Sequence, residues 1–404
     1  MASERPTEER LILRSVSVEN STVFSSSDWD KIIKPYLNRE VDFPTLLELQ
    51  RQLTALYRNA GYPTSRFVLL DQDINNATVT YQAIEGKLVK ITIEGLSHLQ
   101  DSYIRSRLEA AASSPLSMTK LQEALVLLQQ NPLIETIEAD FEAGVIQGES
   151  TLLVRIVEAP QILLGIKADN WENPQIGAVG MSVYGSNLNV WGWGERLDFE
   201  YKLTEDRGLA RLFASYTVPL NVDDTTLRLY YRDDDTRIVE TPLEDVGLVT
   251  ESSTFSVGVT QPLIKKPNEE LNIDVSLDIR QSENFIFETI PFPTFGDSNR
   301  LNLSVLRLSA SFLSRTPETS FGISSQLSLG LGVLGASPES DLLNTDFFSW
   351  QLQAQYAIKL SDNWIFLSRF QGQVTPDSLP SMEQFALGGG RNRSGVSAQY
   401  SFWR

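Results

Sequence analysis

The segment whose residue types most suggest chemistry lies near the C-terminus, at residues 381–396, and reads SMEQFALGGGRNRSGV. It combines a run of three glycines, residues 388–390, with Arg391 and Arg393. Glycine-rich backbone beside positive charge is one way to bind a phosphate group. The segment does not fit the G-x-x-x-x-G-K-[ST] phosphate loop, however, and no strand–loop–helix pattern surrounds it. Its role must therefore depend on the elements that position it.

Catalytic and metal chemistry have few other candidates. The 404 residues contain no cysteine and one histidine, which excludes disulfides, thiolate metal sites and all-histidine sites. The histidine, His98, lies in the polar turn EGLSHLQDS and is expected to be a solvated loop residue. Acidic runs such as YYRDDDTR, residues 230–237, are typical of solvated loops. The sequence predicts no catalytic residue, no metal site and no cofactor, so a strand-rich hydrolase is a disfavoured alternative.

Charge and hydropathy limit the partners and the membrane topology. The formal net charge is -18, which argues against nucleic acid because phosphate neutralisation needs basic patches. No stretch reaches the about 18 apolar residues of a membrane-spanning helix. The opening MASERPTEER has no apolar segment, so it is no secretory signal; we expect a cytosolic protein or a re-started mature N-terminus. A membrane β-barrel stays possible, because its alternating strands hardly register on hydropathy.

The first 160 residues contain an internal repeat with a period of about 70 to 75 residues. In each copy an alternating strand precedes two helical segments and two further strands. We assign residues 12–87 to the first copy and 88–160 to the second, after a linker at 1–11. A three-stranded sheet covered on one face by two helices would bury one core per copy. The matching landmarks are Val18-Glu19-Asn20 with Ile93-Glu94-Gly95, and Ala83-Ile84-Glu85 with Ile156-Val157-Glu158.

From Gln161 onward about eleven segments show period-two alternation. Many approach the about 9–11 residues of a tilted membrane-spanning strand. One face is apolar and aromatic, whereas the other carries charged or amide groups. At residues 197–203, for example, Leu197, Phe199, Tyr201 and Leu203 alternate with Asp198, Glu200 and Lys202.

The connections between these segments distinguish a barrel from a soluble sandwich. Those after the fourth, eighth and tenth segments are short (NVDD, RTPE and SDN), whereas those after the fifth, seventh and ninth are long and acidic. Short turns on one rim and long loops on the other are typical of outer-membrane barrels. A soluble β-sandwich or jelly roll stays the alternative, but it would not separate short and long connections in this way.

A repeat arm followed by such a barrel resembles the two-partner secretion transporters, the TpsB family of FhaC, ShlB and HecB type for haemolysin secretion and activation. Their arm units are called POTRA domains. The segment VSVENSTVF, residues 16–24, is similar to the opening of the first POTRA unit. The segment LYRNAGYPTSRFVL, residues 56–69, resembles its helix–Gly-Tyr–strand junction. Two units, rather than a larger array, favour this family over the BamA-type assembly proteins.

The resemblance implies an α+β fold of tandem POTRA domains, each β-α-α-β-β, followed by an antiparallel transmembrane β-barrel at residues 161–404. It also gives the glycine-rich segment a role, because the family's loop at 376–396 folds back into the barrel lumen. That loop carries Leu-Gly-Gly and then Val-Arg-Gly-aromatic; here Arg393-Ser394-Gly395-Val396 replaces the second motif. Glycines would form a tight tip, and arginine would pair with lumenal carboxylates. The implied lumen-loop residues are Phe385, Leu387, Gly388, Gly389, Gly390, Arg391 and Arg393.

Eleven or twelve strands are fewer than the about sixteen that the resemblance implies. Open edges would leave unsatisfied backbone groups in lipid. We therefore expect a partial or frameshifted transporter that lacks its signal sequence and about four or five strands. An intact closed barrel of about twelve strands is the less favoured alternative.

The implied function is the capture of an unfolded, β-rich partner exoprotein by POTRA domains in the periplasm and its secretion through a barrel in the outer membrane of a Gram-negative-type bacterium. The expected partners are this polypeptide and outer-membrane lipid, with no small-molecule substrate. The alternatives are a BamA-like assembly factor and a non-functional truncated relic. The strand SRFVLL offers an edge for β-augmentation, although core packing is favoured for Tyr57 because of its helical spacing. The implied partner-binding residues are Tyr57, Tyr62, Arg66, Phe67 and Leu69.

Overall fold

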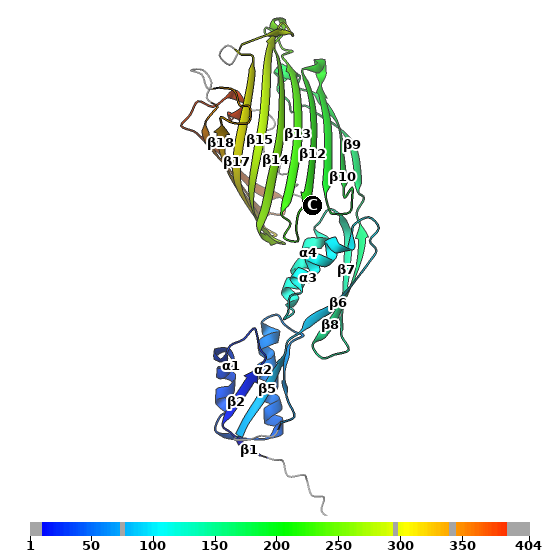
Figure 1. The fold of residues 1–404 in the computed structure, drawn as a ribbon, viewed down its shortest axis with the longest axis vertical. Coiled ribbons are helices and arrows are strands. Elements are labelled where there is room, and N and C mark those ends of the chain that lie inside the picture. The colour runs from blue at the N-terminus through cyan, green and yellow to red at the C-terminus, as the bar shows by residue number, and fades with distance from the viewer. Residues whose placement is uncertain (1–9, 73–76, 294–297, 339–344, 386–404) are drawn as a thin grey trace, which may run out of the picture. The chain divides into compact units, whose positions relative to one another are not determined.

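The computed structural model describes residues 10–72, 77–293, 298–338 and 345–385. The chain divides into two compact units, residues 1–159 and 160–404. The first unit mixes helices with short strands, whereas the second is built almost entirely of long strands (Figure 1). This agrees with the sequence, in which the apolar residues change from a helical spacing to strict alternation.

The first module of unit one is a three-stranded sheet in the order β2-β5-β4. Strand β2 runs parallel to β5, and β4 runs antiparallel to it. A small ribbon of β1 and β3, which the sequence pattern did not predict, is added beside it. The elements are β1 (Leu11–Leu13), β2 (Ser15–Glu19), α1 (Ser26–Ile33), β3 (Arg39–Val41), α2 (Phe43–Asn59), β4 (Arg66–Leu69) and β5 (Thr78–Ile84).

Helix α2 builds the core of this module. Asp42 caps its N-terminus by accepting a hydrogen bond from the Thr45 N–H at 2.9 Å. Four residues at helical spacing face inward and are at most 3% exposed: Leu46, Leu49, Leu53 and Tyr57. They pack against the buried sheet residues Phe67, Val79, Tyr81 and Ala83. The predicted helix with its apolar face toward a three-stranded sheet is therefore confirmed.

The second module repeats this plan, with a sheet in the order β6-β8-β7 and two helices. Strand β6 is parallel to β8, and β7 is antiparallel to it. Its buried strand residues, Leu152, Val154 and Ile156, alternate along β8. The elements are β6 (Lys87–Glu94), α3 (Asp101–Ala111), α4 (Met118–Gln129), β7 (Ile134–Ala143) and β8 (Glu149–Glu158).

The second unit is one antiparallel sheet in which each strand pairs with the next along the chain. In the part of the chain that the structure describes, β9 and β20 are its two edges. The two-residue strand β16 extends β15 at the rim. The strands are β9 (Ile162–Asp169), β10 (Gly180–Leu188), β11 (Arg196–Thr204), β12 (Leu209–Pro219), β13 (Thr226–Arg237), β14 (Val249–Lys266), β15 (Glu269–Ile286), β16 (Ile290–Pro291), β17 (Arg300–Arg315), β18 (Thr319–Leu331), β19 (Phe348–Ser361) and β20 (Trp364–Val374).

The two faces of this sheet differ as the alternation predicted. On β11 the apolar side chains Leu197, Phe199 and Tyr201 are 41–45% exposed, whereas Lys202 on the other face is 1% exposed. From β13 onward the connections also alternate as predicted. Short turns join β17 to β18 and β19 to β20, and longer segments join β13 to β14, β15 to β17 and β18 to β19. An apolar outer face and a polar inner face are the pattern of a membrane barrel wall.

Several strands are longer than the sequence pattern predicted. Strands β14 and β15 have 18 residues each and β17 has 16. The acidic run at residues 230–237, whose end was expected to lie on a long solvated loop, belongs to β13 throughout, because hydrogen bonding to β12 and β14 continues through it. Among the described residues, no helix is long and apolar enough to cross a membrane.

Candidate functional site

The segment that follows β20, residues 375–385, lies against the polar face of the large sheet. Its first residues are held at the rim, where the Phe348 N–H donates to Asp377 at 2.8 Å and the Thr375 hydroxyl donates to the Phe348 carbonyl at 2.7 Å. A 3₁₀ turn, η6 (Ser381–Glu383), then carries the chain across β15 and β17. This segment, here named the inner segment, is the described beginning of the predicted lumen loop.

An apolar patch on the otherwise polar face receives the inner segment. Leu301, Leu303 and Val305 of β17 are 0–1% exposed and form a cluster with Phe347 and Leu379. Met382 of η6 packs against the same cluster. The inner segment therefore buries a small hydrophobic core on the polar side of the sheet, which stabilises its position there.

A buried carboxylate, Glu383, fixes the inner segment to two strands. Its side chain is 3% exposed and accepts two hydrogen bonds from Arg307 of β17, at 2.9 and 3.1 Å. Arg280 of β15 pairs with the same carboxylate and also donates to the Met382 carbonyl at 2.9 Å. A two-pronged arginine–carboxylate contact fixes orientation as well as distance.

The charges of this cluster balance. Arg307 also donates to Asp278 at 2.7 Å, and Asp278 in turn accepts from the Ser256 hydroxyl at 2.6 Å. Two guanidinium groups therefore face two carboxylates, Glu383 and Asp278. Because a buried charge is costly without a partner, removing any one member would leave the others uncompensated. We name Asp278, Arg280, Arg307 and Glu383 the buried quartet, after its two carboxylates, which are at most 8% exposed.

Hydrogen bonds from β20 hold the end of the inner segment. The Gln373 side-chain amide donates to the Glu383 carbonyl at 2.8 Å, and its oxygen accepts from the Phe385 N–H at 2.8 Å. Phe385, a predicted lumen-loop residue, is thus tied to the sheet through its backbone. The other predicted members, Leu387, Gly388, Gly389, Gly390, Arg391 and Arg393, lie outside the described residues.

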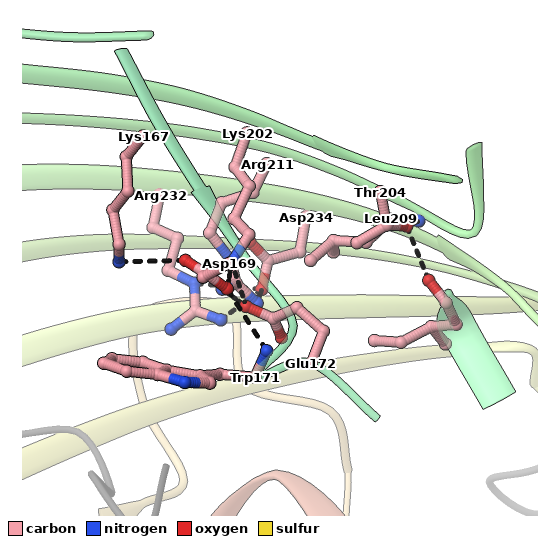
Figure 2. A network of polar contacts seen from close by, with 11 residues as sticks. Lys167, Asp169, Trp171, Glu172, Lys202, Thr204, Leu209, Arg211, Arg232 and Asp234 are labelled. Atoms are coloured by element: carbon pink, nitrogen blue, oxygen red, sulfur yellow. Dashed lines mark hydrogen bonds and ion pairs between the residues drawn. The ribbon is translucent and has the colours of Figure 1, made fainter. Parts of the chain in front are cut away.

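A second charged network holds another connection over the same face (Figure 2). Lys202 of β11, which is 1% exposed, donates to Asp169 at 3.0 Å and to Glu172 at 2.8 Å. Arg211 of β12 bridges Glu172, at 3.7 Å, and Asp234 of β13, at 2.8 Å. Glu172 belongs to the connection between β9 and β10, so this network fixes that connection to three neighbouring strands.

The polar face of the sheet is lined by ion pairs between neighbouring elements. Within the described ranges, no group of three or more acidic or histidine side chains is placed to hold a metal ion. Several of the charges pair across neighbouring strands, such as Arg211 with Asp234 and Arg307 with Asp278. They line the face opposite the apolar one, and two connections fold over them.

Glu383 was not predicted as a site residue, although it lies in the segment at residues 381–396. The family resemblance implied that arginines of the loop pair with carboxylates of the sheet, whereas Glu383 of the inner segment pairs with arginines of the strands. One signal was present in the sequence. Leu301, Leu303 and Val305 lie on one face of β17, and Leu306 and Leu308 lie further along the strand on the opposite face. A strand with apolar residues on both faces predicts cover on both.

The predicted partner-binding residues of the first module divide into two groups. Tyr57 and Phe67 are 0% exposed and pack in the core with ring centroids 5.2 Å apart. Tyr62 and Leu69 are partly buried against that core, and Arg66 is partly exposed. The strand that carries Arg66, Phe67 and Leu69, β4, is an edge strand as expected. Core packing accounts for Tyr57 and Phe67, and a role of this edge in binding stays a prediction.

The chain matches known proteins over nearly its whole length. Its sequence is 22% identical to the outer membrane transporter CdiB of Dickeya dadantii over 97% of this chain and 71% of that protein. It is 24% identical to the heme/hemopexin transporter protein HuxB of Haemophilus influenzae over 61% of this chain and 44% of that protein. In structure it resembles CdiB from Escherichia coli, with a TM-score of 0.70 and 17% identity over 94% of this chain and 71% of that one. CdiB from Acinetobacter baumannii gives a TM-score of 0.62 and 15% identity over 94% of this chain and 70% of that one.

Two family models match the chain itself. A ShlB-type POTRA domain matches residues 11–86, the first module of unit one. The model of the haemolysin secretion/activation proteins matches residues 148–395, which include the sheet, the buried quartet and the inner segment. The chain therefore belongs to the ShlB/FhaC/HecB family of haemolysin secretion/activation proteins, the outer-membrane transporters of two-partner secretion.

Proposed function

We propose that this chain captures an unfolded, β-rich exoprotein on the periplasmic side and moves it across the outer membrane along the polar face of its sheet. The observation that carries the proposal is that the large sheet of this family member has one apolar face and one charged face. Apolar side chains suited to lipid cover one face, and paired charges cover the other. A hydrated, charged wall lets a polar chain pass without adhering to apolar surface.

The inner segment has a defined place in this proposal. It occupies the polar face over β15 and β17, where a passing polypeptide would need room. We therefore assign it the role of a movable obstruction, held at rest by the buried quartet and by the apolar cluster. Residues 376–396 form the proposed lumen loop, of which the inner segment is the described beginning.

Secretion by the bacterium that encodes the chain provides the test. The gene is disrupted and then restored, and the proteins on the cell surface and in the medium are compared by mass spectrometry. One large β-rich protein should disappear on disruption and return on restoration. An unchanged set of surface proteins would contradict the proposal.

The same comparison separates secretion from the assembly of membrane proteins. If the chain were a BamA-like assembly factor, disruption would reduce many integral barrel proteins together. Loss of one exoprotein at constant levels of the integral barrels supports secretion. A general fall of integral barrels would favour the assembly alternative.

A reversible lock tests the role of the inner segment. Because the chain has no cysteine, paired cysteines placed at Met382 and at Leu301 or Leu303 report on this contact alone. Oxidation should stop release of the exoprotein, and a reductant should restore it. Single-cysteine variants provide the control, since they cannot form the cross-link. Full secretion by the oxidised pair would show that the segment does not obstruct the path.

A further inference from the structure

A pocket of about 320 Å³ opens on the polar face of the large sheet, between β14, β15 and the inner segment. Ser252 and Ser282 line it from the strands, and Ser381 and Met382 line it from the inner segment. Among the described residues that line it, Arg280 is the only one with a charge. The pocket therefore combines one cation with hydroxyl groups, and its described lining includes no carboxylate.

Arg280 uses only part of its guanidinium in the buried quartet. Its contact with Glu383 and its hydrogen bond to the Met382 carbonyl both come from Nη1. Its Nε is buried and has no hydrogen-bond partner in the described part of the chain. Because nearly all buried polar atoms in folded proteins have a partner, such an atom calls for an explanation. A guanidinium presents its donors as a planar fork, so a second carboxylate can bind beside the first.

Two serine hydroxyls line the same pocket. Ser252 of β14 and Ser282 of β15 lie directly opposite each other in the register of the sheet. Ser282 and Arg280 are two residues apart on one strand, so their side chains lie on the same face. Ser282 is 4% exposed, and within the described ranges neither serine hydroxyl has a hydrogen-bond partner. The pocket thus contains three donors that the described residues do not use.

These donors define the chemical class of the ligand. A positive charge with hydroxyl donors fits an oxyanion, and Glu383 shows that this guanidinium binds a carboxylate. A carboxylate accepts about four hydrogen bonds at its two oxygens, so Arg280 and both serines can share one group. Because the pocket lies on the face along which a polypeptide is proposed to pass, acidic side chains of that polypeptide are the carboxylates that reach it.

Charge balance decides what a bound carboxylate does to the inner segment. The buried quartet has two guanidinium groups and two carboxylates, so a third carboxylate leaves one negative charge in excess. Like charges in one buried site disfavour each other. Departure of Glu383 restores the balance, because the new carboxylate then neutralises Arg280 in its place. Arg307 keeps its contact with Asp278 throughout this exchange.

We propose that this pocket binds a carboxylate of the passing polypeptide, and that the bound carboxylate replaces Glu383 on Arg280 and so releases the inner segment. The ligand is an aspartate or glutamate side chain, and Ser252 and Ser282 hold it during the exchange. The polypeptide in this way removes the obstruction from its own path over β15. This inference rests on the proposed transport of a polypeptide along the polar face.

Limited proteolysis of the full chain in detergent micelles tests the inference. The probe is a short peptide that alternates serine with aspartate and has both ends blocked, and the matched peptide has asparagine in place of every aspartate. Chymotrypsin has sites in the inner segment at Leu379, Met382 and Phe385, and mass spectrometry follows their cleavage. The aspartate peptide should accelerate it about tenfold, the effect of a tenfold shift in the equilibrium between the held and released segment, and salt should reduce the acceleration. No acceleration, or equal acceleration by the asparagine peptide, would overturn the inference.

Sodium acetate distinguishes a free carboxylate from one carried by a polypeptide. At the same concentration of carboxylate groups, acetate should accelerate the cleavage less than the aspartate peptide does, because neighbouring groups of the peptide raise the effective concentration. Equal acceleration by acetate would overturn the assignment of the pocket to a passing polypeptide.

A carboxylate built into the pocket should replace the peptide. In Ser252→Asp the inner segment should be cleaved rapidly without any peptide, whereas Ser252→Asn, which has the same shape without the charge, should keep it protected. The control is Ser324→Asp on β18, because Ser324 faces Ser311 in a similar serine pair but does not line the pocket. Protection of Ser252→Asp equal to that of the wild type, or equally rapid cleavage of Ser324→Asp, would overturn the inference.

Removal of the hydroxyls tests the pocket from the opposite direction. In Ser252→Ala with Ser282→Ala, the concentration of aspartate peptide that gives half of the full acceleration should rise about tenfold, the loss expected for two hydrogen bonds. The matched control is Ser311→Ala with Ser324→Ala. An unchanged concentration in the pocket variant, or the same rise in the control, would contradict binding by these serines.

Secretion by the wild-type chain keeps the two proposals distinguishable. If it releases its exoprotein while the aspartate peptide leaves the cleavage unchanged, the pocket assignment fails and the transport function stands. If it releases none while the aspartate peptide still accelerates cleavage, the carboxylate site stands and the proposed function fails.

Discussion

At the scale of single residues, the two modules of unit one share one device. Glu85 directly follows the last strand of the first module and accepts hydrogen bonds from the Thr22 N–H at 2.7 Å and the Tyr57 hydroxyl at 2.8 Å. Glu158 ends the last strand of the second module and accepts from the Ser97 N–H at 2.8 Å and the Leu99 N–H at 2.9 Å. Each glutamate therefore fixes the loop between the first strand and the first helix of its module. The sequence repeat matched these two positions but gave no reason for them.

Replacing either glutamate should loosen its own loop. In Glu85→Gln the amide accepts with one oxygen and adds donors, so the charge-assisted bonds are lost at a cost of about 2 kcal/mol. We expect faster hydrogen exchange at residues 20–24 in Glu85→Gln and at residues 97–99 in Glu158→Gln. Glu109→Gln, on the exposed face of α3, is the control. Exchange that rises equally in both loops for one variant would contradict separate anchors.

The same two carboxylates predict a pH dependence. Burial raises the pKa of Glu85, but hydrogen bonds from Thr22 and Tyr57 outweigh it, and its pKa lies below the usual value. Burial also raises the pKa of Glu158, and backbone hydrogen bonds from Ser97, Leu99 and His98 lower it further than burial raises it. A lowered folded-state pKa contributes stability that is complete above the unfolded value, about 4.3, and is lost as pH falls through the folded value.

The protection of the loops at residues 20–24 and 97–99 from hydrogen exchange should therefore be constant from neutral pH down to about pH 5 and should decrease below about pH 4. Protection factors from hydrogen exchange measure this, because they divide out the intrinsic pH dependence of exchange. The double variant Glu85→Gln with Glu158→Gln should show a flatter profile over the same range. An unchanged acid response in this variant would assign the effect to other carboxylates.

The buried quartet carries the residue-scale prediction for the large sheet. Glu383→Ala removes the carboxylate that faces Arg280 and Arg307, and loss of one member of a buried charge cluster costs about 3–5 kcal/mol. The inner segment should then leave the polar face while the sheet persists. Faster proteolysis within residues 375–385, with unchanged heat-modified migration of the sheet, would report this. The control is Glu318→Ala, at the exposed turn between β17 and β18, and similar proteolysis in both variants would contradict a specific anchor.

At the scale of elements, the sequence predicted the type and order of the helices and strands better than it predicted where each one begins and ends. The helices and strands of unit one were foreseen because their apolar residues follow the helical or the alternating period. The ribbon of β1 and β3 was not predicted, because a three-residue strand contains too few positions to show an alternation of apolar and polar residues. In the large sheet, β13 continues through Asp235 to Arg237, where the end of the acidic run had indicated the start of a long loop. Pairing with both neighbouring strands, and the contact of Asp234 with Arg211, keeps that run in the sheet.

The candidate site was predictable only in outline for a related reason. The position of a returning segment was inferred from the family resemblance, and residues 375–385 do lie against the polar face. The anchor of this segment was not predicted, because Glu383 contacts Arg280 and Arg307, which lie 103 and 76 residues away in the sequence. No local period encodes such a contact. Only the two-sided apolar pattern of β17 indicated that something covers this face.

At the scale of the whole molecule, the decisive property is the opposition of the two faces of the sheet. Single cysteines can test it directly, since the chain has none of its own. Leu197→Cys and Phe199→Cys place a thiol on the apolar face of β11, and Asp198→Cys and Glu200→Cys place one on the polar face. The four positions are adjacent, so they share the same depth and differ only in direction.

In outer-membrane vesicles a charged maleimide should label the polar-face cysteines and leave the apolar-face cysteines unlabelled, because lipid excludes a charged reagent. A maleimide that carries an apolar chain should label the apolar-face cysteines more than the polar-face cysteines. Labelling of all four cysteines after the vesicles are dissolved in denaturant shows that each thiol is reactive. Equal labelling of both faces in intact vesicles would contradict a lipid-facing sheet and would favour a soluble strand-rich fold. Because the two faces alternate residue by residue, a shift of register by one position would exchange the two results, so the experiment also checks the pairing of β11 with β10 and β12.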